Sequence, residues 1–122
     1  MDFFLDTYAM IEIVKGNKNY EPCLDKVLIT TKYNLAELHY FLLTNFNLEV
    51  ADLYLKKFSV YAIDFDINVI SKSMVFRKNL RSKKIKISYI DCIGYMVAIA
   101  NKARFLTGDS HFHELPNVEF IK

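Results

Sequence analysis

Short apolar runs alternate with helix-length intervals along the whole sequence, and this alternation limits the fold more than any other feature. Five runs have the length and composition of buried strands, and they span residues 2–5, 26–31, 60–64, 103–107 and 118–121. Residues 34–46 and 49–58, which lie between two of these runs, place apolar side chains at helical spacing. Strands that alternate with helices predict an α/β fold whose parallel sheet is covered on both faces.

The length and composition predict one globular domain over residues 1–122. Of the residues, 52% are hydrophobic and 25% are charged, and no repeat or linker divides the chain. The longest uncharged runs are too short to span a bilayer, and the acid at Asp2 is unlike the basic start of an export signal. Cys23 and Cys92 lie in no ligand spacing and are expected to be buried free thiols. We therefore expect a cytoplasmic protein that does not associate with membranes.

Several classes of site are excluded or weakened by the residues present. The chain has only three glycines, which cannot form the glycine-rich loop of a dinucleotide or P-loop site. Its three histidines lack the partners of a zinc site and are interpreted as surface or capping residues. Asp6 is followed by Thr7 and Tyr8, not by the second acid that an aspartate-based phosphotransfer enzyme would typically carry two positions later.

Two acids follow predicted strands, and two others interrupt apolar helix openings. Asp6 and Asp109 should lie side by side at the carboxyl edge of the sheet if their strands are neighbours. Asp91 and Glu37 are each followed by apolar helix residues. Each acid also has a structural interpretation. Asp6 and Asp109 could cap helices, Asp91 could complete a capping box with Ser88, and Glu37 could be solvated.

Together the four acids indicate a cation site more strongly than any of them does alone. Carboxylates that are buried near one another are electrostatically costly unless a cation neutralises them. Oxygen ligands without thiolate or imidazole suit Mg²⁺ or Mn²⁺, which are often held together with phosphate oxygens. The pattern therefore predicts a Mg²⁺ or Mn²⁺ site.

The ordered set of acids, with Thr7 after the first of them, the helix at residues 91–100 and the segment at residues 106–112, resembles the PIN-domain ribonucleases. The likeness extends over essentially the whole chain and is greatest to the VapC-like toxins of toxin–antitoxin pairs. It implies a PIN-like three-layer α/β/α sandwich with a central parallel five-stranded sheet in the order 3-2-1-4-5. Gly94, inside the helix at 91–100, departs from the pattern and suggests close packing there.

The resemblance also assigns roles to residues and implies partners. The acids that match the family's catalytic and metal-binding positions are Asp6, Glu37, Asp91 and Asp109. Thr7 and Thr107 are the neighbouring hydroxyls that would orient ligands or water. A VapC-like protein would also have a small antitoxin partner. A homodimer is expected from the high mean hydropathy of +0.10 and from apolar residues on more than one face of the helix at 34–46.

A basic segment is hidden by the near-neutral net charge of +2. Residues 77–86 hold six basic residues and no acid, and the other 112 residues carry 10 basic and 14 acidic ones. The predicted RNA-binding residues are Arg77, Lys78, Arg81, Lys83, Lys84 and Lys86. If the helix continues that far, Arg77, Arg81 and Lys84 share one face. The alternative interpretation is a solvated charge run at a helix end.

These observations favour a Mg²⁺- or Mn²⁺-dependent endoribonuclease that hydrolyses RNA phosphodiester bonds as the toxin of a toxin–antitoxin pair. The alternative is a non-catalytic PIN-like module that binds RNA or protein and uses its carboxylates only as caps.

Overall fold

The structure, a computed structural model, describes residues 1–122. Its strands and α-helices follow one another as β1 (Phe3–Leu5), α1 (Thr7–Val14), β2 (Leu28–Ile29), α2 (Lys32–Asn45), α3 (Leu48–Phe58), α4 (Asn68–Ser82), α5 (Tyr89–Ala100), β3 (Arg104–Thr107) and β4 (Val118–Phe120). Three 3₁₀-helices connect them, namely η1 (Lys18–Cys23), η2 (Ser59–Tyr61) and η3 (Ser110–Phe112). The helices expected at 34–46 and 49–58 are confirmed as α2 and α3.

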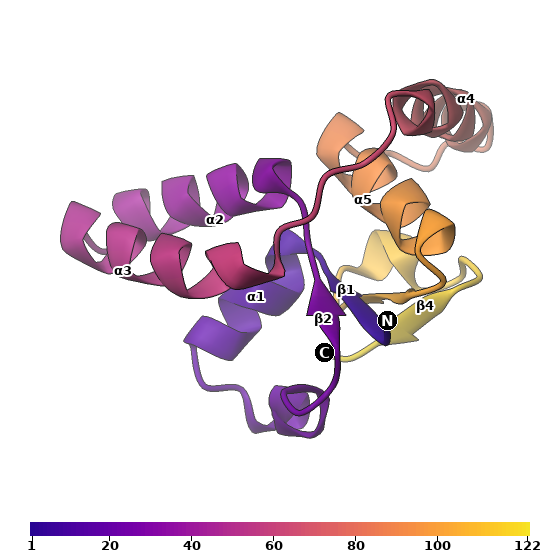
Figure 1. The fold of residues 1–122 in the computed structure, drawn as a ribbon. Helices are drawn as coiled ribbons and strands as arrows, with labels where there is room; N and C mark the ends of the chain where they lie inside the picture. The colour runs from indigo at the N-terminus through magenta and orange to yellow at the C-terminus, as the bar shows by residue number, and fades with distance from the viewer.

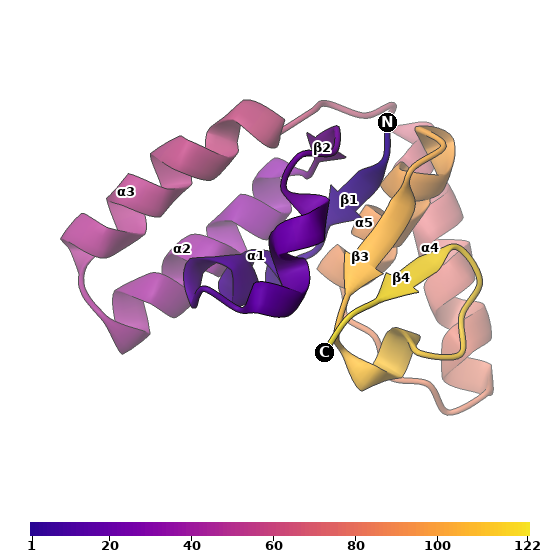
Figure 2. The same cartoon turned by 90° about the horizontal axis from the view of Figure 1, so that it is seen from below.

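The strands form one parallel sheet in the order β2-β1-β3-β4 (Figure 2). In the register of the two pairings that β1 makes, Phe4 of β1 lies opposite Ile29 of β2 and Phe105 of β3. The predicted α/β class with a parallel sheet is confirmed. Because β1 and β3 are neighbours, the residues that follow them lie beside each other at the carboxyl edge of the sheet.

The prediction of five strands is wrong, because residues 60–64 do not form a strand. The amide of Thr30 donates to the Tyr61 carbonyl at 2.9 Å, and the amide of Ile63 donates to the Thr30 carbonyl at 3.0 Å. These bonds make a single parallel bridge between Thr30 and Ala62. The segment lies beside β2, where the order 3-2-1-4-5 puts it, but η2 occupies its start and β2 is only two residues long. The 3₁₀-helix η2 ends at Tyr61, directly before the bridge, and α2 begins at Lys32, two residues after Thr30, so the ladder does not extend.

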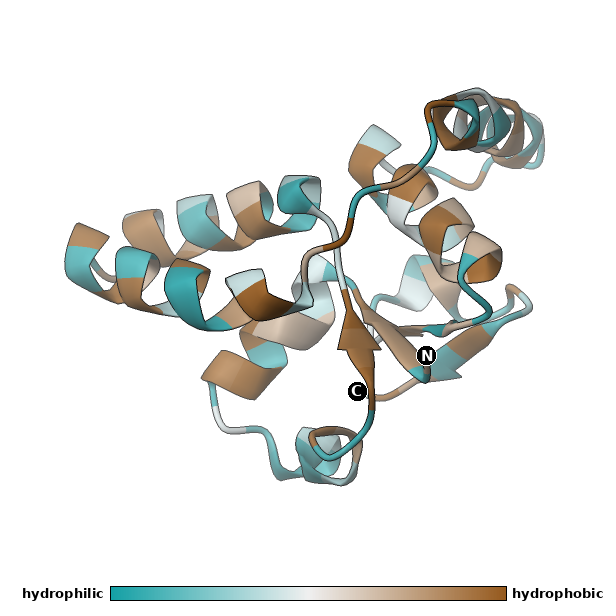
Figure 3. Cartoon of the chain, in the orientation of Figure 1, coloured by the Kyte–Doolittle hydropathy of each residue, from teal (hydrophilic) through white to brown (hydrophobic).

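Alternate residues of the strands face two separate hydrophobic clusters, one on each side of the sheet. Phe4, Ile29 and Phe105 pack with residues of α4 and α5. Leu5, Leu28 and Leu106 pack with residues of α1, α2 and α3. Figure 1 shows the resulting three layers, with α1 to α3 on one side of the sheet and α4 and α5 on the other. The hydropathy colours in Figure 3 fit a sheet that is buried between helices, since β2 is hydrophobic throughout. The helices α2 and α3, which also face solvent, alternate between polar and apolar residues.

Gly94 marks a close contact between α5 and the sheet. A Cβ atom at this position would lie 2.9 Å from Cε1 of Phe4 and 3.3 Å from Cε1 of Phe105. The glycine therefore lets the helix approach two stacked aromatic rings, whose centroids are 5.6 Å apart. The close packing that was expected around Gly94 is therefore confirmed.

Two further expectations concern thiols and membrane spans. Cys23 and Cys92 are both buried and free, as predicted. No helix combines the length and the apolar character that crossing a membrane requires.

Candidate functional site

The four acids singled out in the sequence lie around one open cavity at the carboxyl edge of the sheet. Asp6 follows β1, Glu37 is in the second turn of α2, Asp91 is in the first turn of α5, and Asp109 follows β3. All four line a cavity of about 480 Å³ together with Thr7. The fold thus brings together acids from four separate segments of the chain.

Asp6 is the most deeply buried of these acids, with 2% of its surface exposed. Its Oδ1 accepts the amide of Ala9 at 2.8 Å and caps α1. Burial raises the pKa of Asp6 from 3.8 to about 8, even though hydrogen bonds with Thr107 and Ala9 lower it. The negative charges of Asp91 and Asp109 raise the pKa of Asp6 further. An ionised Asp6 is therefore unfavourable without a compensating positive charge.

The pKa of Asp91 is raised by burial and by the other acids, as that of Asp6 is. Burial raises the pKa of Asp91 from 3.8 to about 6, and hydrogen bonds with Ser88 partly offset this effect. The charges of Glu37 and Asp109 act in the same direction as burial. Since Glu37, Asp91 and Asp109 each raise the pKa of another acid of the group, the carboxylates repel one another and would attract a cation.

The capping interpretations of Asp6 and Asp109 are supported by the geometry, and one half of the capping box proposed for Asp91 is present. Asp6 caps α1, and Oδ1 of Asp109 accepts the amide of His111 at 3.0 Å and caps η3. Ser88 caps α5, and its hydroxyl accepts the amide of Asp91 at 3.1 Å. A carboxylate has two oxygens, so one oxygen in a cap leaves the other available to a ligand. Capping and cation binding are compatible at these positions.

Both predicted hydroxyls contact the acids. Thr7 donates its hydroxyl to Oε1 of Glu37 at 2.6 Å. The Thr107 hydroxyl accepts the backbone amide of Asp109 at 3.0 Å and lies near enough to Asp6 to lower its pKa. The bond from Thr7 ties the Glu37 carboxylate to a fixed position, and the bond to Thr107 fixes the backbone at Asp109.

Two residues beside the acids were not predicted from the sequence as part of the site. His111 lies with Nδ1 2.8 Å from Oδ1 of Asp109, although more than half of its side chain is exposed. Asn34 is fully buried, and its Nδ2 donates to the Thr7 hydroxyl at 3.2 Å. The only signals in the sequence are their spacings, two positions after Asp109 and three before Glu37, and such spacings are common.

The residues suit a hard cation by their chemistry but do not form a preformed cluster. No three Asp, Glu, His or Cys side chains lie close enough together to hold a metal ion directly. The donor set around the cavity is made of carboxylates and hydroxyls. Mg²⁺ prefers such ligands and usually keeps several of its own waters, so it does not need all the carboxylates in direct contact. The donor set therefore fits Mg²⁺ or Mn²⁺.

The basic segment ends α4 and leads into α5, and the structure corrects the prediction of a continuous helical face. The helix ends at Ser82, and Lys84 is in the left-handed region with φ of +62°. The amides of Lys84 and Ile85 donate to the carbonyls of Arg81 and Leu80, which is a Schellman helix end. Lys84 therefore does not share a helical face with Arg77 and Arg81.

The six basic residues differ in their freedom to bind a ligand. The Arg77 side chain is half-buried, since its Nε donates to the Ile87 carbonyl at 3.1 Å and its guanidinium lies 4.1 Å from the centroid of the Tyr89 ring. The other five, which are exposed and form no salt bridge, are Lys78, Arg81, Lys83, Lys84 and Lys86. Arg77 therefore holds the loop in place, and the other five present unpaired charge.

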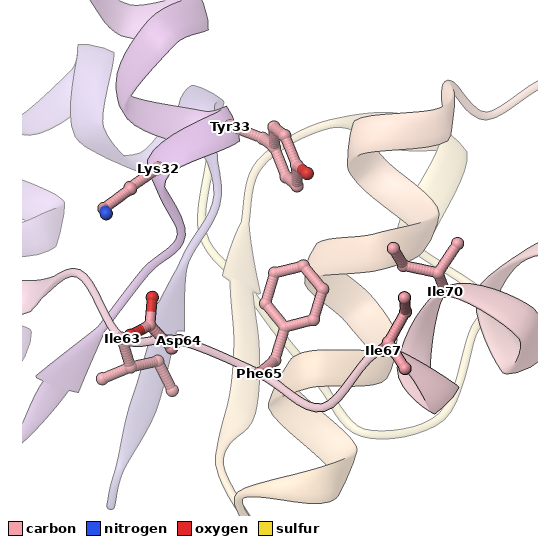
Figure 4. A pocket seen from close by; sticks show the side chains of 7 residues that line it. All are labelled: Lys32, Tyr33, Ile63, Asp64, Phe65, Ile67 and Ile70. Atoms are coloured by element: carbon pink, nitrogen blue, oxygen red, sulfur yellow. The ribbon is translucent and has the colours of Figure 1, made fainter.

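A second cavity, of about 380 Å³, lies where the start of α2 meets the segment that leads into α4 (Figure 4). It is lined mainly by apolar side chains, among them Tyr33, Phe65 and Ile67, with Lys32 and Asp64 as its charged residues. None of the four acids lies in its wall. Its chemistry does not resemble that of the acidic cavity.

Comparison with known proteins identifies the family. The family model described as the PIN domain matches residues 3–118. No curated protein matches the sequence.

Solved structures share the fold at low sequence identity. A chain in the structure of VapBC2 from Rickettsia felis bound to a DNA fragment from the promoter is 23% identical, with a TM-score of 0.79 over 99% of this chain and 98% of that one. The DNA-bound VapBC of Salmonella typhimurium is 17% identical, with a TM-score of 0.76 over 99% and 97% of the two chains. VapBC-1 of nontypeable Haemophilus influenzae is 15% identical, with a TM-score of 0.78 over 100% and 98%. With a matching family model over nearly its whole length, the chain belongs to the PIN domain family.

Proposed function

We propose that this PIN domain is a divalent-metal-dependent endoribonuclease that acts as the toxin of a toxin–antitoxin pair. The proposal is carried by one observation: four carboxylates from four segments line a single open cavity, and the most buried of them has its pKa raised to about 8. Membership of the PIN family and the likeness in fold to VapBC proteins support the same conclusion.

The acids Asp6, Glu37, Asp91 and Asp109 would together hold Mg²⁺ or Mn²⁺. Such a cation, when bound, lowers the pKa of a water molecule and neutralises charge that develops on the phosphodiester. The chain's own contribution is to orient its ligands, since Thr7 donates a hydrogen bond to Glu37 and Thr107 accepts one from the backbone amide of Asp109. The cavity is open to solvent along the exposed Tyr40, so a polynucleotide backbone can approach the acids.

A protein partner and a second copy of the chain belong to the same proposal. Three large apolar side chains are exposed at the end of α2, namely Tyr40 and Leu43 within the helix and Phe46 directly after it, and Tyr40 lines the acidic cavity. Exposed apolar groups of this kind are typical of interfaces. We infer that a small antitoxin covers the cavity, which the likeness in fold to chains of VapBC structures supports. We also infer from the exposed apolar side chains that the chain forms a homodimer.

The function is tested by the dependence of RNA cleavage on metal. We expect the protein to cut RNA internally in the presence of Mn²⁺ or Mg²⁺ and to lose this activity in EDTA. Millimolar Mn²⁺ should also raise the melting temperature of the metal-free protein, because a ligand that binds only the native state stabilises it. RNA binding with neither cleavage nor a Mn²⁺-dependent shift would favour the non-catalytic binding module.

The lysines of the loop after α4 are expected to bind RNA phosphates. Replacing Lys83, Lys84 and Lys86 by alanine should weaken RNA binding about tenfold at low salt and reduce the slope of log affinity against log salt by about 2. Fluorescence anisotropy in EDTA measures binding apart from cleavage.

The matched control for this loop removes three exposed lysines from elsewhere in the chain, Lys18, Lys26 and Lys56. This variant loses the same net charge but should keep the affinity and the salt slope of the wild type. If both triple variants lost the same RNA affinity, the lysines of the loop would act only through the overall charge of the protein.

A further inference from the structure

A chain of side-chain hydrogen bonds runs from the start of α2 to the Glu37 carboxylate. The hydroxyl of Thr31 donates to Oδ1 of Asn34 at 2.6 Å, and Nδ2 of Asn34 donates to the hydroxyl oxygen of Thr7 at 3.2 Å. Thr7 in turn donates to Oε1 of Glu37 at 2.6 Å. Thr31 and Asn34 are buried, so no water competes for the bond between them, whereas Thr7 and Glu37 are partly exposed at the cavity.

The direction of this chain follows from the number of hydrogens that each group can give. Thr31 accepts the backbone amide of Asn34 at 3.3 Å, and its single hydroxyl hydrogen then goes to Oδ1 of Asn34. The oxygens of Thr7 and Glu37 are 2.6 Å apart, a distance that requires a hydrogen between them. An ionised carboxylate has none, so Thr7 supplies it. Thr7 can therefore only accept from Asn34.

We propose that Asn34 is a positioning residue, which acts through Thr7 to hold the Glu37 carboxylate at the cavity wall with one oxygen bonded and the other left for a ligand. The amide side chain of Asn34 accepts from Thr31 at one end and donates to Thr7 at the other. An ionised aspartate has no such donor. The inference rests on the proposed function, in which Glu37 is one of the acids that hold the cation.

The value of this arrangement is that the Glu37 side chain is ordered before any ligand arrives. Glutamate has three rotatable bonds, and fixing them costs free energy that would otherwise be lost from ligand binding. Because Asn34 and Thr7 already fix the Glu37 side chain in the folded protein, this conformational entropy is lost on folding and not on ligand binding. Loss of such a supporting contact typically weakens metal affinity or activity about 10- to 100-fold.

The direct test is the variant Asn34→Asp. Its new carboxylate should take the Thr7 hydrogen, so that in the crystal structure determined in EDTA the Thr7 hydroxyl lies more than about 3.5 Å from Oε1 of Glu37. The Mn²⁺ concentration that gives half of the thermal shift should rise about tenfold or more. RNA affinity in EDTA should stay within about twofold of the wild type. If the short Thr7–Glu37 contact persists in Asn34→Asp, the inference is wrong.

A second variant covers the case in which a buried aspartate prevents folding. Thr7→Val removes the same bond to Glu37 and should raise the half-saturating Mn²⁺ concentration equally. In a Glu37→Gln background, neither Asn34→Asp nor Thr7→Val should change the Mn²⁺ response further, because both act through Glu37. Additive effects in that background would overturn the inference.

Thr30→Val is the matched control. The Thr30 hydroxyl is also fully buried, but it donates to the Leu5 carbonyl at 2.7 Å and forms no hydrogen bond with the four acids. Its loss should lower the melting temperature and leave the Mn²⁺ response unchanged. A wild type that does not respond to Mn²⁺ would refute the proposed function, whereas the structure of Asn34→Asp in EDTA would still decide the role of Asn34.

Discussion

Asp6→Asn is expected to reduce metal-dependent RNA cleavage by about 10³-fold, the largest loss of activity from any single change in the cavity. Asparagine keeps the shape of the side chain and can still accept the Ala9 amide that caps α1. It removes the negative charge of the acid that lies deepest in the site. Losing several kcal/mol of electrostatic stabilisation corresponds to a rate loss of this size. Single-turnover cleavage of one RNA, with Mn²⁺ in excess, measures it.

The same variant should be more stable than the wild type in EDTA at pH 8. Because burial raises the pKa of Asp6 to about 8 from 3.8, the native state holds a proton that the unfolded state releases. The stability of the metal-free wild type therefore falls as the pH rises from about 4 to about 8. The asparagine side chain does not titrate, so the melting temperature of the variant should exceed that of the wild type at pH 8 by about 5 °C or more and approach it near pH 4.

The control for both effects is Asp25→Asn, which changes an exposed acid outside the cavity. It should keep the cleavage rate and the melting temperature of the wild type at each pH. A fully active Asp6→Asn would refute the proposed mechanism. An Asp6→Asn less stable than the wild type in EDTA at pH 8 would mean that the carboxylate is compensated by a group of the protein.

Gly108→Ala should produce the largest loss of stability. A Cβ atom at Gly108 would overlap the ring of Tyr8 and the carbonyl oxygen of Ile121. The second of these is backbone, so the clash cannot be relieved by a side-chain rotation alone. Overpacking of this kind costs about 3 kcal/mol, which corresponds to a fall in melting temperature of roughly 10 °C. Urea denaturation followed by circular dichroism measures the change in the free energy of unfolding.

Gly16→Ala separates the overlap from the general effect of replacing a glycine. Gly16 has a φ of +76° but no neighbour within 4 Å of an added Cβ. Its replacement should cost only about 1 kcal/mol, the penalty of a left-handed backbone for alanine. If both variants lose equal stability, the contact of Gly108 with Tyr8 and Ile121 is not the cause.

The sequence was informative wherever one local pattern determines the structure. Apolar runs identified four of the five proposed strands, and helical spacing located α2 and α3, because burial on one face leaves a period in the sequence. The position of acids directly after β1 and β3 led to the cavity, because parallel strands end at the same edge. The convergence of Asp6, Glu37, Asp91 and Asp109 on one cavity followed the expected pattern.

What the sequence did not reveal depends on contacts between distant segments. Residues 60–64 are apolar enough for a strand, but η2 before the bridge and the start of α2 at Lys32 leave them a single bridge to Thr30. The half-buried state of Arg77 depends on Tyr89, twelve positions away, and the left-handed Lys84 follows from how α4 ends. Asn34 is an ordinary helix residue until the structure shows that it lies against Thr7.

The two hydrophobic clusters on opposite faces of the sheet have a consequence for how remote mutations affect this protein. Glu37 belongs to a helix of one cluster and Asp91 to a helix of the other, while Asp6 and Asp109 extend from the two strands between them. The cavity thus spans a seam between two independently packed layers. A small shift of either layer changes the spacing of the carboxylates. A mutation in either hydrophobic cluster is therefore expected to change the affinity for a cation, even far from the cavity.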